Sequence, residues 1–186
     1  MIACYVGGKG MYATAATWDV KTAVILSLEE GGIGYDTRFR YYRRQFPELS
    51  TADLARQICD PIENYDRDWP EWRVRQAGDC DDNERITAFF LERDRRFREE
   101  ARAGIFCLDE AGFGSGVNVM RFIHAGKPVL GIYRSGVEAR AVNVGNFLQL
   151  RMEYPDLMSL SAYQAADDML GEVRRWLSVL PAARSR

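Results

Sequence analysis

Short apolar runs, each followed by a glycine-rich or polar turn, recur along this chain. The clearest are Ile2–Val6, Gly104–Leu108 and Val129–Tyr133. The first run is apolar throughout instead of alternating with polar residues, which is typical of a strand that is buried on both faces of a parallel sheet. The three runs therefore predict the strands of a mainly parallel sheet.

Apolar residues also recur at helical spacing between and after the runs, which predicts helices that cover the sheet. Near the end of the chain, for example, Met169, Val173 and Leu177 fall on one face. The expected helices are about 18–30, a short one from Ser50 or Thr51 to Cys59, about 84–103, about 117–124 and about 161–180. Residues 135–150 are expected to form a loop and a strand.

Residues 103–134 predict a complete strand–helix–strand unit. An apolar run, a glycine-rich turn, a helical segment and a second apolar run follow one another, and the Gly-Lys-Pro sequence at 126–128 ends the helix. Two strands joined in this way are parallel neighbours with a right-handed crossover. The expected fold is a three-layer Rossmann-like (flavodoxin-like) α/β domain over residues 1–186, with a mainly parallel sheet and an insertion at about 41–85.

The turn after the second run is a candidate ligand site, because ligands of open parallel sheets bind beyond the carboxyl ends of the strands. Gly114 and Gly116 allow the backbone to approach a ligand, and Ser115 can cap the helix or offer a hydroxyl. A helix start of this kind favours a phosphate or carboxylate. The spacing is neither the dinucleotide fingerprint nor a Walker loop. The alternative is that these glycines serve the geometry of the turn alone.

The loop after the first run is a second candidate. Gly7, Gly8 and Gly10 would admit a sugar or phosphate, and Tyr12 would offer a stacking face. Both loops follow parallel strands, so they are expected at the same edge of the sheet. The alternative is a mobile loop that covers a partner subunit.

Three carboxylates are candidates for catalysis. Asp109 and Glu110 end the second run, where either would be placed to activate water. Asp94 lies between Phe90 and Phe97 near the apolar face of a predicted helix, so it is expected either to pair with an arginine or to face the site.

Arginines and tryptophans in the middle of the chain leave further alternatives open. Arg38, with Arg40, Arg43 and Arg44, would suit phosphate or carboxylate groups, although solvated side chains are the simpler interpretation. Trp69 and Trp72 lie in an acidic stretch, where they would either stack on a base or cover the stretch itself.

Several short motifs together resemble the nucleoside 2-deoxyribosyltransferase superfamily, which includes the 2'-deoxynucleoside 5'-monophosphate N-glycosidases. They are the opening strand with its glycine loop, Glu-Arg-Asp at 92–94, Gly-Ser-Gly-Val-Asn at 114–118 and Gly-Lys-Pro-Val at 126–129. The resemblance covers most of the chain in order, except about 41–85.

The resemblance implies a protein that binds a nucleoside or nucleoside monophosphate and cleaves or transfers at the C1'–N bond. Asp94 would handle a proton near the base, and Asn118 takes the position of the family's nucleophilic glutamate, where it would hold the sugar. The family's architecture implies a homodimer with Asn143 or Asn146 reaching the neighbouring site. The alternative is a catalytically inactive nucleotide-binding sensor or interaction module of the same fold.

Composition limits the classes of partner, the cofactors and the cellular location that we expect. A net charge of -2 gives no reason to expect nucleic acid or an anionic membrane. The four cysteines form no Cys-x-x-Cys pair and have no neighbouring histidine, so no metal site is expected, and nothing calls for a cofactor. The chain has no signal-peptide pattern or membrane-length apolar run, so we expect a cytoplasmic protein with reduced thiols.

Overall fold

The computed structural model describes residues 1–9, 13–59, 92, 94–136 and 142–180. Within this part of the chain, five parallel strands form one sheet in the order β2-β1-β3-β4-β5. The strands are β1 (Ile2–Gly8), β2 (Gly34–Asp36), β3 (Ala103–Cys107), β4 (Val129–Arg134) and β5 (Met158–Tyr163). The predicted three-layer α/β fold with a parallel sheet is confirmed.

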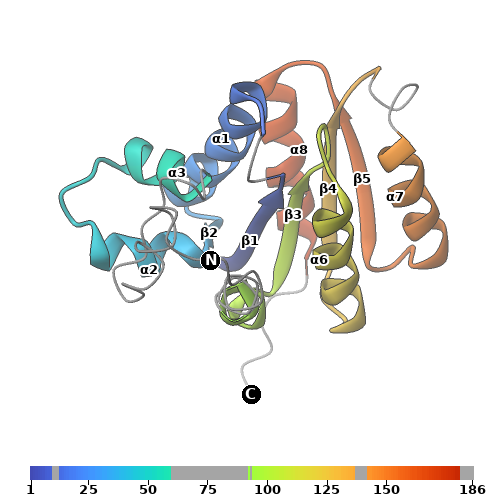
Figure 1. The fold of residues 1–186 in the computed structure, drawn as a ribbon, viewed down its shortest axis with the longest axis horizontal. Helices are drawn as coiled ribbons and strands as arrows, with labels where there is room; N and C mark the ends of the chain where they lie inside the picture. The colour runs from blue at the N-terminus through green and yellow to red at the C-terminus, as the bar shows by residue number, and fades with distance from the viewer. Residues whose placement is uncertain (10–12, 60–91, 93, 137–141, 181–186) are drawn as a thin grey trace, which may run out of the picture.

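Helices cover both faces of the sheet (Figure 1). On one face α1 (Ala15–Gly31) lies over β1, β2 and β3, and α8 (Ala166–Val179) packs beside it. On the other face α6 (Phe113–His124) crosses β1, β3 and β4, and α7 (Val142–Glu153) lies along β5. At the β2 edge α2 (Thr37–Gln45) contacts β1 and β2, and α3 (Thr51–Cys59) packs on α1 and α2.

The core is centred on β1 and β3, as their uninterrupted apolar runs predict. All five residues of β3 are buried, and so are residues 3–7 of β1. Tyr5, Phe106 and Phe122 form an aromatic group beneath α6, with ring centroids 5.8 to 6.1 Å apart. Apolar burial of this extent is the main stabilising contribution in a domain of this size.

The end of the chain differs from the prediction in two elements. Residues 142–153, expected as part of a loop and strand, form helix α7, and the helix expected from Ser161 begins only at Ala166. The preceding residues form β5, which pairs with β4 in register from Val129↔Met158 to Arg134↔Tyr163. Segment β5 is an edge strand that is fully buried only at its two ends, so it lacks the continuous apolar run that marks β1 and β3.

Part of the segment expected as an insertion belongs to the described fold. It contains the end of α2 and all of α3, the short helix predicted from Thr51 to Cys59. Asp36 begins α2, because its carboxylate accepts the Arg38 N–H at 2.8 Å as an N-cap. Trp69 and Trp72 lie outside the described residues, so their prediction is left as it stands.

Candidate functional site

The order in which strands are added to the sheet reverses at the pair β1–β3. The crossover from β1 leads to β2 on one side, and the chain later adds β3, β4 and β5 on the other. At the carboxyl ends of the pair, Gly8 of β1 is in register with Cys107 of β3. In open parallel sheets a reversal of this kind marks the crevice in which ligands bind. The two predicted glycine-rich turns lie at this edge, and they differ from each other.

The turn before α6 is open. Gly112 is the N-cap in an extended conformation, and its carbonyl accepts the N–H groups of Ser115 and Gly116 at 3.1 and 3.2 Å. A Cβ atom added at Gly112, Gly114 or Gly116 would meet no atom within 4 Å. The space that the sequence predicts beside Gly114 and Gly116 is therefore present. Ser115 is buried, and its hydroxyl makes no capping hydrogen bond, so the predicted capping role is wrong.

Gly7 and Gly8, the last two residues of β1, pack closely against β3. A Cβ atom at Gly7 would lie 2.3 Å from Cε1 of Phe106, and one at Gly8 would lie 2.8 Å from the carbonyl oxygen of Cys107. Gly8 also has a φ of +135°, which side chains rarely adopt. Packing within the sheet thus accounts for both glycines. Gly10 and Tyr12 lie outside the described residues, and of Asn143 only the backbone, in α7, is described.

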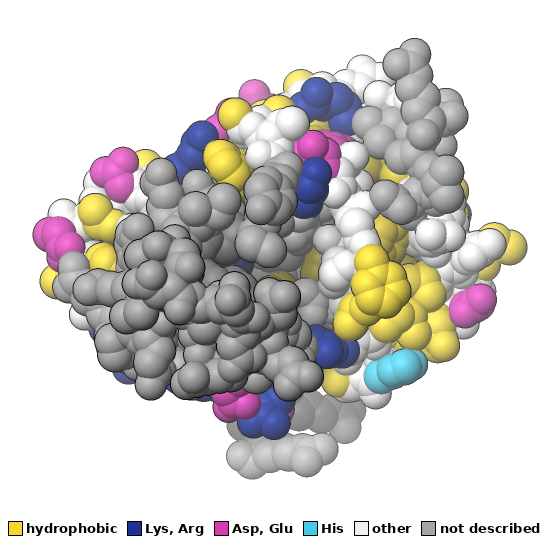
Figure 2. All heavy atoms as spheres, viewed as in Figure 1, with side chains coloured by type: hydrophobic (Ala, Val, Ile, Leu, Met, Phe, Trp, Pro, Cys, Tyr) yellow, Lys and Arg dark blue, Asp and Glu magenta, His cyan; other side chains and the backbone are white. Residues whose placement is uncertain are grey.

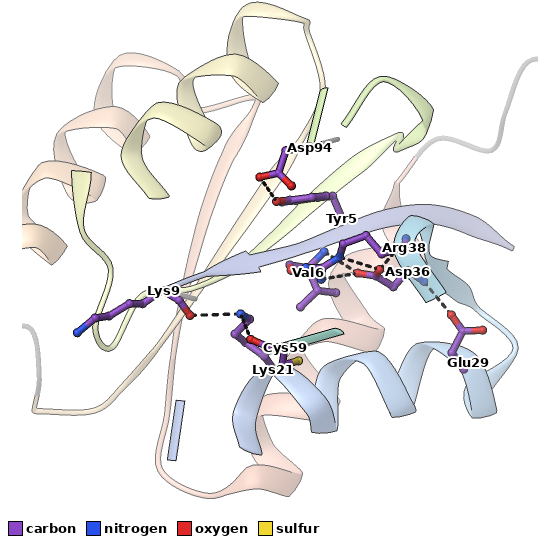
Figure 3. Close-up of polar contacts among 9 residues, drawn as sticks. All are labelled: Tyr5, Val6, Lys9, Lys21, Glu29, Asp36, Arg38, Cys59 and Asp94. Carbon is purple, nitrogen blue, oxygen red and sulfur yellow. Dashed lines mark hydrogen bonds and ion pairs between the residues drawn. The ribbon is translucent and has the colours of Figure 1, made fainter. Parts of the chain in front are cut away.

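Asp94 and Asn118, the residues predicted to handle a proton and to hold the sugar, are brought together on the α6 face of β1. The Tyr5 hydroxyl points toward Asp94 and donates to Oδ2 at 3.4 Å (Figure 3). The Arg98 guanidinium lies 3.9 Å from the same carboxylate and donates to Oδ1 of Asn118 at 3.0 Å. Arg121 reaches the same amide oxygen at 3.5 Å. We call these five residues the Asp94 cluster.

Asn118 is held as a hydrogen-bond acceptor in this cluster. Its amide oxygen faces two guanidinium groups, which leaves its NH₂ group to donate to a ligand. Arg98 is only 8% exposed, and Asp94 is partly buried. Burial lowers the pKa of Arg98, with Tyr5 and Asp94 acting in the opposite direction. The cluster thus joins a buried guanidinium with a shifted pKa to a carboxylate and an amide, and residues with shifted pKa are frequent at functional sites.

Asp109, one of the two carboxylates predicted to activate water, lies elsewhere. Its two carboxylate oxygens accept the backbone N–H of Arg134 and the hydroxyl of Tyr163. The carboxylate thereby fastens the end of β3 to the ends of β4 and β5. Burial raises the pKa of Tyr163, and the hydrogen bond to Asp109 adds to that effect. These contacts give Asp109 a structural role in place of the predicted water activation.

Glu110 fastens the start of α1. One of its oxygens accepts the Thr14 N–H at 2.8 Å, the Thr14 hydroxyl at 2.9 Å and the Thr17 hydroxyl at 2.6 Å. Lys9 lies 3.9 Å from the other oxygen. Partial burial acts to raise the pKa of Glu110, but the hydrogen bonds from Thr17 and Thr14 lower it overall. The Glu110 carboxylate therefore occupies the position at the start of α1 where a helix favours a negative charge.

A second buried polar group lies near the end of β1, and the sequence analysis missed it. The Asp36 carboxylate accepts the Val6 N–H at 3.0 Å and pairs with Arg38 at 3.0 Å, as Figure 3 shows. The expectation of a solvated Arg38 is wrong, because it is 8% exposed and lies 5.0 Å from the centre of the Tyr5 ring. Burial acts to lower the pKa of Arg38, and the charge of Asp36 raises it overall.

Lys21 is buried on the α1 side of the same strand end. Its ammonium donates to the carbonyl oxygens of Lys9 and Cys59 at 3.2 and 3.3 Å (Figure 3), and no carboxylate of the described residues forms an ion pair with it. Burial lowers its pKa. The sequence held a signal for this residue, because Lys21 shares the apolar helical face of Val24, Ile25 and Leu28.

A groove between α6 and α7 lies next to the open turn. Its volume is about 620 Å³, and its lining includes Phe113, Val117 and Met120 of α6 with Phe147 and Leu150 of α7. Phe113 is 90% exposed. Figure 2 shows the hydrophobic side chains gathered over these two helices.

The described residues contain no group of side chains suited to a metal ion, and their three cysteines are buried. Within them, no three His, Cys, Asp or Glu side chains are grouped so that they could hold a metal ion. Burial raises the pKa of the thiols of Cys4, Cys59 and Cys107, which disfavours the reactive thiolate. No helix in this part of the chain is long and apolar enough to cross a membrane.

Comparison of the chain with protein-family models and with curated proteins gives no match.

Proposed function

We propose that the protein binds a nucleoside or nucleoside monophosphate beside the open turn at 112–116 and cleaves its N-glycosidic bond at the Asp94 cluster. The observation that carries the proposal is the meeting of Asp94 and Asn118, which are 24 residues apart in the chain, through one buried guanidinium. The open turn supplies space at the start of the same helix. Sugar hydroxyls and a leaving base are ligands that carboxylate and amide groups recognise.

The reaction would be a hydrolysis in which Asp94 and Asn118 each have one role. The C1'–N bond breaks with its electron pair going to the base, water adds its oxygen to C1', and the proton that the water loses returns to the Asp94 carboxylate. Asp94 is the group that passes a proton to the leaving base, and the NH₂ of Asn118 donates to a sugar hydroxyl. Asp109 and Glu110 have no part, because their oxygens accept hydrogen bonds from the scaffold.

The second candidate is a binding module that has no turnover. It is favoured by one observation: the residue in the position of the family's nucleophile is Asn118, whose oxygen is engaged by Arg98. An amide is a much poorer nucleophile than a carboxylate. A protein of this kind would recognise the same nucleotide and serve as a sensor or interaction partner.

Two further features belong to the proposal. A homodimer is expected from the family resemblance, and the apolar groove between α6 and α7 supplies a face for the second copy. A cytoplasmic location is expected, and the free, buried thiols of Cys4, Cys59 and Cys107 fit a reducing compartment.

Incubation with a panel of nucleosides and their monophosphates, followed by chromatography for the free base, tests the proposal. Asp94→Asn should lower base release by about 100-fold or more, because it removes the proton donor. Asp156→Asn, an exposed site in the turn before β5, is the matched control and should act like the wild type. Each variant is checked for folding by circular dichroism.

The outcomes separate the two candidates. Ligand binding in calorimetry with no base released at high protein concentration would establish the binding module and end the enzyme proposal. In that case Asn118→Glu, which supplies the carboxylate, is expected to gain cleavage. If no member of the panel binds, both candidates are wrong.

A further inference from the structure

A basic cavity lies behind Asn118, between α6 and the helical segment 94–100. Its volume is about 370 Å³. Its walls hold four cationic side chains, one carboxylate and an aromatic ring: Arg95, Arg98, Arg121, Lys127, Glu99 and Phe122. On the face shown in Figure 2, Lys and Arg side chains lie beside the hydrophobic group over α6 and α7. Four positive charges against one negative charge favour an anionic occupant.

Arg98 supplies the strongest reason for an occupant. The residue is 8% exposed, and its guanidinium has five N–H donors. Its Nη1 group serves Asn118 at 3.0 Å and lies 3.9 Å from Asp94, whereas its Nε and Nη2 groups have no acceptor among the described residues. Arg98 lines the cavity, so these two groups are available to an oxygen atom of an occupant.

Lys127 and Arg121 keep donors for the same occupant. The Lys127 ammonium donates to the carbonyl oxygens of Arg98 and Glu99 at 2.6 and 2.9 Å, which leaves one of its three N–H groups. Partial burial lowers the pKa of Lys127. Arg121 is exposed and makes one long contact of 3.5 Å, to Asn118. By contrast, Arg95 already pairs with Glu92 and Glu99.

We propose that this cavity binds the phosphate group of a small phosphorylated ligand. A phosphate offers three acceptor oxygens and up to two negative charges, which match the converging donors of Arg98, Arg121 and Lys127 better than a single carboxylate does. The volume leaves room beyond the phosphate for the organic part of the ligand, with Phe122 as an apolar wall. Arg98 joins this site to Asn118 and therefore to the Asp94 cluster.

The test is a titration of the full chain with inorganic phosphate at constant ionic strength, followed by calorimetry and by the midpoint of thermal unfolding. Phosphate is expected to bind saturably and to raise the midpoint, whereas chloride does neither. Arg121→Gln should weaken binding about tenfold, because it removes a charge-assisted hydrogen bond. Arg121 is exposed, so this variant is expected to fold.

The matched control is Arg175→Gln on α8, an exposed arginine that pairs with Glu172. It should bind phosphate like the wild type. The proposal is overturned if phosphate has no saturable effect beyond that of chloride, or if Arg121→Gln and Arg175→Gln bind phosphate equally. If Arg121→Gln does not fold, Arg95→Gln replaces it, with a smaller loss of affinity expected.

A second arm identifies the source of the phosphate. This arm depends on the proposed function, whereas the phosphate titration does not, so the two can fail separately. If a nucleoside monophosphate displaces phosphate and binds more tightly than its nucleoside, the cavity holds the phosphate of the substrate. If both bind at once, the cavity takes a separate phosphorylated effector. Either result supports the site.

Discussion

The glycines at the carboxyl ends of the neighbouring strands β1 and β3 differ in their surroundings. Gly7 and Gly8, which end β1, pack on the protein, whereas the glycines of the turn after β3 have open space beside them. At Gly7 the ring of Phe106 occupies the space that a side chain would need. At Gly112, Gly114 and Gly116 nothing approaches within 4 Å of the missing side chain. A glycine thus allows close packing of the protein on itself as readily as close packing on a ligand, and the composition of the loop does not distinguish the two.

The carboxylates near the same strands differ in a similar way. Glu110 accepts three hydrogen bonds that hold the start of α1, and Asp109 accepts two that join β3 to β4 and β5. The contacts of Asp94 lead instead to Tyr5, Arg98 and, through Arg98, to a second predicted site residue. The proposed function therefore rests on the α6 face and not on the strand end.

The largest expected effect comes from adding a side chain at Gly7, near the end of β1. Gly7→Ala should lower the free energy of unfolding by about 3 kcal/mol, because the new methyl group would lie 2.3 Å from Cε1 of a fully buried ring. Urea unfolding followed by circular dichroism measures the change.

Gly116→Ala, in α6, is the matched control for that substitution. It places the same methyl group in open space within a helix, so it should raise stability by about 0.5 to 1 kcal/mol. Similar losses of stability at the two positions would contradict the distinction between the packed end of β1 and the open turn before α6.

The next effect concerns the structural role of Asp109. Asp109→Ala should lower the free energy of unfolding by about 2 kcal/mol, because the Arg134 N–H and the Tyr163 hydroxyl lose their acceptor. Asp156→Ala, at an exposed position, should change stability by less than about 0.5 kcal/mol. Loss of base release by Asp109→Ala with unchanged stability would instead return Asp109 to the catalytic site.

The central part of the fold could be predicted because its residues carry strong local signals. Strands β1, β3 and β4 are continuous apolar runs, and the helix stop at 126–128 separates α6 from β4. Strand β5 was missed, because Ser159 and Ser161 interrupt its apolar pattern at the edge of the sheet. Helix α7 was missed because Asn143, Gly145 and Asn146 weaken its helical pattern.

The site was predictable only in part. The glycine turn follows an apolar run, so the local pattern was sufficient to find it, whereas Asn118 was singled out by the family resemblance. The contact of Tyr5 with Asp94 joins residues 89 positions apart, and no local pattern encodes it. Likewise Arg38 is buried because Asp36, two residues earlier, is directed inward by the Val6 N–H. Such pairs depend on tertiary packing, which overrides the usual exposure of arginine.

The smallest expected effect is a pH dependence that contrasts Glu110 with Glu29, at the other end of α1. The pKa of Glu110 is lowered, so its stabilising contribution is complete above its unfolded pKa of about 4.5 and is lost as the pH falls through the folded value. Burial raises the pKa of Glu29 to about 7, although its hydrogen bond from the Asp36 N–H acts in the opposite direction. Folded Glu29 therefore keeps a proton that the unfolded chain releases, and its contribution falls as the pH rises from about 4.5 to about 7.

Urea unfolding at pH values from about 2.5 to 8 would measure both contributions. Glu29→Gln should flatten the decline between about pH 4.5 and 7, by about 1 kcal/mol once solvent screening of a partly exposed group is included. Glu110→Gln should leave that decline in place and reduce the loss on the acid side. Because the two glutamates lie at opposite ends of one helix, parallel curves for the two variants would mean that neither local environment controls the pH dependence, and the assignment of Glu110 as a charged anchor would be wrong.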